Sequence, residues 1–169
     1  MRTILRVIDK TSEYTGRGIR WLCVVLILVL TFEVTARHVF NHPTQWAHQT
    51  SLMMSGVIVA LGWAYVHRYR EHIRVDVLYS RFSTRGKAIT DVVLDVLVFF
   101  PLLVALTYAA WSKMWYSWEM HEIMVETYWF PPVGPNRTLV FIGLSLLALQ
   151  GVSNFIKNLY LLVRNKPYD

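Results

Sequence analysis

HRYREHIRVDVLYSRFSTRGK, residues 67–87, is a basic segment that lies between two long apolar segments. It holds six of the seventeen Lys and Arg residues of the chain: Arg68, Arg70, Arg74, Arg81, Arg85 and Lys87. Lys and Arg close to the end of a membrane span resist translocation, so a loop this basic is expected on the cytoplasmic side. The loop therefore predicts the orientation of the spans on either side of it.

The composition predicts a membrane protein. The chain has 169 residues, of which 54% are hydrophobic, and its mean hydropathy is +0.35. This is too apolar for an ordinary soluble domain. A spanning helix needs about 20 mostly apolar residues, and four segments qualify: 21–40, 48–66, 88–111 and 139–163. We therefore predict an all-α integral membrane protein with four transmembrane helices, formed as a single membrane domain over residues 1–169.

The distribution of basic residues gives the topology. Fourteen Lys and Arg residues lie before the first span, in the middle loop or at the C-terminal end from Lys157 onward. Only Lys113 and Arg137 lie in the segment 112–137, and the turn 41–47 has none. This asymmetry predicts that both termini and the middle loop are cytoplasmic. The net charge of +6 then reflects topology and anionic headgroups, and no nucleic-acid partner is expected.

Residues 2–20 combine apolar side chains with five basic ones. This pattern favours a short amphipathic helix on the inner membrane interface, with its basic residues toward lipid headgroups. A frayed tail is the alternative.

Three tryptophans, Trp111, Trp115 and Trp118, fall on one helical face near the end of the third span. They predict an aromatic belt at the outer interface.

Several polar residues lie within or beside the spans. Glu33 and Arg37 stand four residues apart, which suits an ion pair on one helix face, although Arg37 could instead extend toward the outer surface. Asp95 lies one turn deeper than Asp91, and we expect it to pair with arginines of the middle loop, with a proton or cation relay as the alternative. Gln150 and Asn154 are also four apart, and we expect them to hydrogen-bond across helices.

Small residues predict close helix packing, and prolines predict a bend and a loop. Gly56, Ala60 and Ala64 recur every four residues beside Gly62, which predicts a seam for close helix approach. Pro101 is expected to bend the third span. The prolines of residues 130–135, FPPVGP, predict an outer loop.

Signatures of catalysis are missing from the sequence. It holds no Walker, Rossmann, HExxH or GxSxG motif, so we do not expect an enzyme. The single cysteine, Cys23, excludes a disulfide within one chain. His38 and His48 fall near the outer membrane edge on adjacent spans, so a haem-bearing membrane anchor of a redox complex is an alternative. A small glutathione-handling membrane enzyme is another, but it needs several arginines at membrane depth.

The stretches ARHVFNHPTQW (36–46) and EHIRVDVLYSRFSTRGKA (71–88) resemble the small permease subunit of tripartite ATP-independent periplasmic (TRAP) transporters. In that family the first span ends in an Arg-containing segment before a turn with Trp. The second ends in a His-Ile/Val-Arg-Val-Asp motif. These places are matched by Arg37, Trp46, His72, Ile73, Arg74, Val75 and Asp76. Residues 77–79 (VLY) and 146–151 (LLALQG) resemble the branch labelled for mannitol or chloroaromatic compounds. His48 and Gln49 depart from the family, which usually has Glu shortly after the Trp.

The resemblance implies a role in the bacterial inner membrane. Such a subunit braces a large permease subunit, which holds the transport path and the sodium sites, and it helps to dock a periplasmic substrate-binding protein. No cofactor is expected in this chain, and its partners are the two other components and membrane lipids. The transported solute is expected to be an organic anion such as a carboxylate.

The His72–Asp76 motif carries one further expectation. We expect it to tie the middle loop to the inner ends of neighbouring helices, with Asp76 accepting from a nearby arginine. An ordinary basic loop held by headgroups is the alternative.

Overall fold

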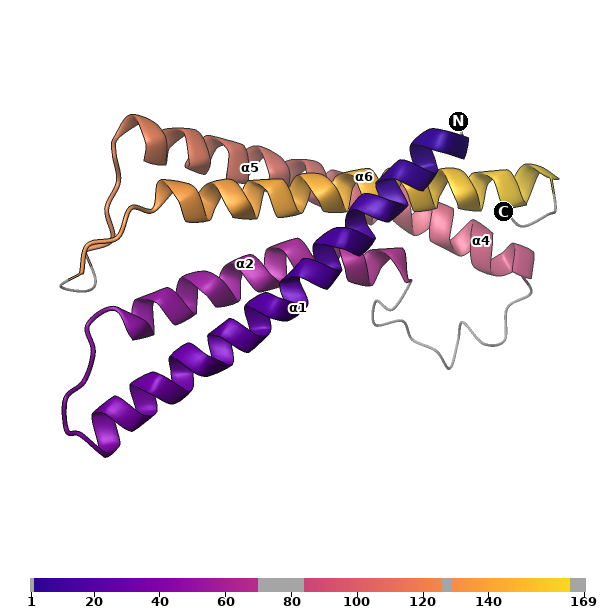
Figure 1. Cartoon of the computed structure of the whole chain (residues 1–169). Coiled ribbons are helices and arrows are strands. Elements are labelled where there is room, and N and C mark those ends of the chain that lie inside the picture. Colours follow the sequence, from indigo (N-terminus) through magenta and orange to yellow (C-terminus); the bar gives the residue numbers. More distant parts are fainter. Residues whose placement is uncertain (1, 70–83, 126–128, 165–169) are drawn as a thin grey trace.

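The computed structural model describes residues 2–69, 84–125 and 129–164, which form a bundle of long helices (Figure 1). The helices are α1 (Arg2–His38), α2 (Ala47–Arg68), α4 (Thr84–Leu94), α5 (Phe100–Glu119) and α6 (Gly134–Arg164). A π-helical turn, Asp95–Phe99, joins α4 to α5. Four helical stretches are long and apolar enough to cross a membrane: Thr3–His38, Ala47–Arg68, Ile89–Glu119 and Gly134–Val163. The predicted all-α membrane fold with four spanning helices is confirmed.

The N-terminal helix is present, but it is not a separate element. It continues without a break into the first span, so that α1 is a single helix of 37 residues. Gly16 does not interrupt it, because this glycine serves packing instead of a turn. A side chain at Gly16 would collide with the ring of Tyr65 on α2. The place of residues 2–20 on the membrane interface stays a prediction.

α6 is the central helix of the bundle. It packs against α1, α2, α4 and α5, and 39% of its most apolar window is buried, compared with 6% for the stretch Ile89–Glu119. A small core forms where Leu103 of α5 meets Leu144 and Leu147 of α6. The third span therefore keeps most of its apolar surface on the outside of the bundle.

The predicted seam on α2 is partly correct. Ala60 and Ala64 are buried, and Gly143 of α6 lies so close that an added Cβ would be 2.5 Å from the Ala60 carbonyl oxygen. Gly56 and Gly62 instead face open space. Four α-helical residues turn the chain by about 400°, so a strict four-residue row drifts by about 40° at each step. Gly56 is thereby rotated out of the contact.

The third span departs from α-helical geometry directly before Pro101. Proline lacks an N–H, and its ring clashes with the carbonyl four residues earlier in an α-helix. Here the chain forms the π-helical turn, in which the Phe100 N–H donates to the Asp95 carbonyl. The turn carries Phe99 into contact with Gly151, and the Phe99 ring stacks on His67 at a centroid distance of 4.8 Å.

At the other end of the third span, α5 continues to Glu119, so Trp111, Trp115 and Trp118 lie on one helix, as the sequence predicts. The predicted outer loop, in contrast, is shorter than expected. α6 begins at Gly134, so the last two residues of the predicted 130–135 loop are helical. Pro135 fits there because the first turn of a helix does not need its N–H as a donor.

Figure 1 shows that the described chain has two distinct ends. The start of α1, the end of α2, the start of α4 and the end of α6 lie together, and we call this the inner end. The α1–α2 and α5–α6 connections lie at the opposite, outer end, where the two helix pairs diverge. This grouping matches the predicted topology, while the side of the membrane that each end faces stays a prediction.

Candidate interaction sites

At the outer end, Glu33 holds the connection between α1 and α2. Its side chain is buried, Arg37 Nη2 donates to its Oε1 at 2.6 Å, and the Thr44 N–H donates to its Oε2 at 3.2 Å. The Thr44 hydroxyl donates to the same Oε2. The expected Glu33–Arg37 pair is therefore present, with the Arg37 side chain 51% exposed. Sequence reasoning missed Thr44, since a threonine eleven residues away gives no periodic signal.

Trp46 and Gln49, where this connection meets α2, lie in different environments. Trp46 is exposed and stacks on Phe32, with ring centroids 6.0 Å apart. Gln49 is buried, and its amide contacts the Met124 sulfur in the α5–α6 connection. Gln49 stands where the resemblance leads us to expect an acidic residue, and in this chain it links the first turn of α2 to the α5–α6 connection. His48 is exposed.

The α5–α6 connection has its own ion pair, which the sequence analysis did not predict. Arg137 Nη2 donates to Glu122 Oε1 at 2.8 Å, and Arg137 Nη1 lies 2.6 Å from Glu122 Oε2. The buried Ser117 hydroxyl donates to Glu122 and accepts from Arg137. We call these three residues the outer clamp. The clamp joins the end of α5 to the first turn of α6, and the only sequence signal for it is opposite charge in one short segment.

At the inner end, Gln150 is at the centre of a buried polar network. Gln150 is fully buried, accepts from the Ser12 hydroxyl at 2.7 Å, and donates to Asp9 Oδ1 at 3.0 Å. It also donates to Asn154 Oδ1 at 3.3 Å, and Asn154 in turn donates to the His67 carbonyl at 2.9 Å. Both amides therefore hydrogen-bond across helices, Gln150 to α1 and Asn154 to α2.

Two ion pairs extend this inner network to the surface. Lys157 lies 2.6 Å from Asp9, which also accepts from Ser153. Glu13 of α1 pairs with Arg68 at the end of α2 and accepts from the Tyr69 hydroxyl at 2.5 Å. This hydrogen bond to a carboxylate raises the pKa of Tyr69 above its usual value. The inner end thus joins α1, α2 and α6 through side chains that are far apart in sequence.

The remaining candidate residues are less informative. Asp95 is half-buried in the π-helical turn, and its pairing with loop arginines stays a prediction. His72, Arg74 and Asp76 lie outside the described residues. Their expected role in tying the middle loop to neighbouring helices therefore also stays a prediction.

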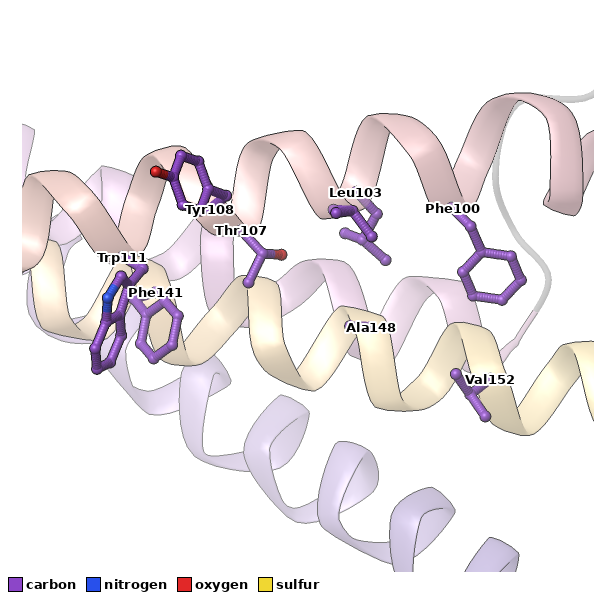
Figure 2. A pocket seen from close by; sticks show the side chains of 9 residues that line it. Phe100, Leu103, Thr107, Tyr108, Trp111, Phe141, Ala148 and Val152 are labelled. Atoms are coloured by element: carbon purple, nitrogen blue, oxygen red, sulfur yellow. The ribbon is translucent and has the colours of Figure 1, made fainter.

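An apolar trough lies between α5 and α6 on the outside of the bundle. Its volume is about 480 Å³. Figure 2 shows Leu103 and Thr107 along its length, with Trp111 and Phe141 toward one end and Phe100 and Val152 toward the other. The Thr107 hydroxyl oxygen is buried and has no hydrogen-bond partner within the described residues.

The histidines do not form an enclosed pair. His38 ends α1 and His48 lies in the first turn of α2, and both side chains are exposed. A haem held by two histidines requires both rings to converge on a shielded pocket. The exposure of both rings gives the haem-anchor alternative no support. Among the described residues, no three His, Cys, Asp or Glu side chains form a group that could hold a metal ion.

Residues 26–160 match the family model described as "Tripartite ATP-independent periplasmic transporters, DctQ component". The match begins within the first span, includes the second and third spans and both outer connections, and ends within the last span. A comparison with curated proteins gives no significant match.

Proposed function

Because the chain belongs to the DctQ family of tripartite ATP-independent periplasmic transporter components, we propose that it is the scaffold subunit of a sodium-coupled importer. In this role it braces a large permease subunit in the inner membrane, with both termini in the cytoplasm, and helps to dock a periplasmic binding protein. The imported solute is an organic anion. Neither catalysis nor a cofactor belongs to this role.

The observation that carries the proposal is the family match over residues 26–160. The contact that we propose for the large subunit is the apolar trough between α5 and α6, because the third span leaves most of its apolar residues outside the bundle. A partner helix in the trough would cover part of that surface.

Co-purification tests this contact. Ala148 lines the trough, and Ala148→Trp fills it, so the yield of the large subunit on a tagged small subunit should fall by about tenfold, a typical cost for losing one well-packed contact. The neighbouring Leu149→Trp is the control, because Leu149 is exposed and does not line the trough. Wild-type yield with Ala148→Trp would reject the trough as the contact.

Transport itself tests the scaffold role. Liposomes that contain this chain alone should take up no solute. Liposomes with both membrane subunits and the binding protein should take up a carboxylate under a sodium gradient and not under an equal potassium gradient. Uptake by the small subunit alone, at the rate of the full system, would overturn the proposal.

The motif at residues 72–76 belongs to the same proposal as a contact to the large subunit. Asp76→Asn should lower assembly more than Glu71→Gln, since an unpaired partner charge in a buried site costs more than loss of an exposed pair. Equal, wild-type-like assembly of both variants would favour a loop held only by headgroups.

A further inference from the structure

We infer that the outer end carries a socket for an acidic side chain of the transporter's periplasmic binding protein. The inference rests on the proposed function, because it names the contact through which docking takes place. The socket is a hollow of about 300 Å³ beside the outer clamp, lined by Ser112, Lys113, Tyr116, Glu122 and Arg137. Its walls come from α5, from the start of α6 and from the connection between them.

The charges that line the hollow leave one cation uncompensated. Glu122 and Arg137 neutralise each other through the two contacts of the outer clamp. Lys113 is exposed, and its ammonium group makes no ion pair or hydrogen bond within the described residues. Two cations and one anion therefore line the hollow, which leaves a net charge of +1. An incoming carboxylate would meet Lys113 together with the hydroxyl groups of Ser112 and Tyr116.

The hollow is also held in shape before any partner arrives. Ser117 is buried beneath it and bonds both charged members of the clamp. Arg137 Nη1 additionally donates to the Lys113 carbonyl at 3.2 Å, which ties the lysine backbone to α6. A preformed site binds more strongly because little side-chain freedom is lost on association.

The position of the hollow favours a protein carboxylate over a phospholipid headgroup. Glu122 lies beyond the end of α5, in the outer connection, so one wall stands outside the helices. A bound phospholipid also needs an adjoining apolar surface for its acyl chains. The α5–α6 trough could offer one, but it shares no lining residue with this hollow. A periplasmic protein that approaches from the outer end needs no such surface.

Transport measured at increasing concentrations of the binding protein tests the socket. The assay uses proteoliposomes with both membrane subunits and the binding protein encoded with them. Lys113→Glu should raise the half-saturating concentration of binding protein by about tenfold, and Lys113→Gln by about threefold, because charges at an interface rim act mainly on association. The maximal rate should stay at its wild-type value. Lys10→Glu is the matched control, since Lys10 is exposed at the inner end.

Two further measurements make the result decisive. Ser112→Asp adds a negative charge to another wall of the hollow and should act in the same direction as Lys113→Glu. In the binding protein, one Asp→Lys or Glu→Lys change should restore the wild-type dependence of the Lys113→Glu transporter. An unchanged half-saturating concentration in both socket variants would overturn the inference.

The outcomes also separate the socket from the scaffold role. If both variants co-purify with the large subunit and transport as wild type, the socket is wrong and the scaffold role stands. If the variants change only the amount of co-purified anionic phospholipid, the hollow is a headgroup site and the inference fails. If the wild-type chain does not assemble with the large subunit, the proposed function itself fails.

Discussion

The inner and outer ends of this small membrane protein are built differently. At the inner end, Gln150 and Asp9 join α6 to α1 across more than 140 residues of sequence. At the outer end, the ion pairs stay local: Glu33 bonds Arg37 and Thr44, and Glu122 bonds Arg137. Among the described residues, one polar side-chain contact links the two helix pairs at this end. The Gln49 amide of α2 contacts the Met124 sulfur in the α5–α6 connection.

This difference indicates that polar side chains hold the helices together mainly at the inner end. Long-range polar contacts at the inner end hold three helices in one arrangement. Local clamps at the outer end stiffen each helix pair without joining the pairs to each other, and the pairs diverge there (Figure 1).

The first prediction concerns the side that each end faces. In a Cys23→Ser background, Glu119→Cys at the outer end should react with a membrane-impermeant thiol reagent added to intact cells. Lys10→Cys at the inner end should react only after the membrane is made permeable. Both positions are exposed in the structure, so access depends on the membrane alone. The reverse labelling pattern would invert the topology.

The second prediction concerns the seam that joins the helix pairs. Gly143→Val should lower the free energy of unfolding by about 3 kcal/mol, because its Cβ meets the Ala60 backbone, which cannot rotate away. Gly56→Val adds the same side chain in open space and should cost well under half as much. Thermal unfolding of the purified chain in detergent measures both. Equal losses would show that the α2–α6 contact is not close.

The third prediction concerns the inner network. Gln150→Leu replaces the amide with an apolar side chain of similar size and removes the bonds to Ser12, Asp9 and Asn154. The expected loss is about 1–2 kcal/mol, since hydrogen bonds between membrane helices are individually weak. Gln45→Leu, at an exposed position of the α1–α2 connection, should cost almost nothing. A smaller loss for Gln150→Leu than for Gln45→Leu would contradict the long-range role of the network.

The fourth prediction is local. Glu33→Gln weakens the bonds to Arg37 and Thr44, and should destabilise the fold less than Gln150→Leu does, because Arg37 is half exposed. Hydrogen exchange of the Thr44 amide should speed up by about two- to fivefold, and amides at the inner end should keep their rates. Faster exchange at both ends would show that the Glu33 contacts are coupled to the inner network.

Much of this fold could be predicted from the sequence, because apolar length decides which segments span a membrane. The joining of residues 2–20 to the first span could not, since the contact of Gly16 with Tyr65 joins positions that are far apart in sequence. The hydrogen bonding of Gln150 and Asn154 to other helices could be predicted, because both are polar side chains inside an apolar span. Their partners did not follow, because Ser12 and Asp9 are unremarkable residues of a basic helix.

The π-helical turn at Asp95–Phe99 amounts to one extra residue in an otherwise α-helical span. One α-helical residue turns the chain by about 100°. The extra residue therefore rotates α5 relative to α4 and changes which of its faces packs against α6. A relative without it should be one residue shorter between Asp91 and Pro101. Deleting one residue there should be tolerated better than deleting one in α6. In evolutionary terms, this turn is where the fold can change its length.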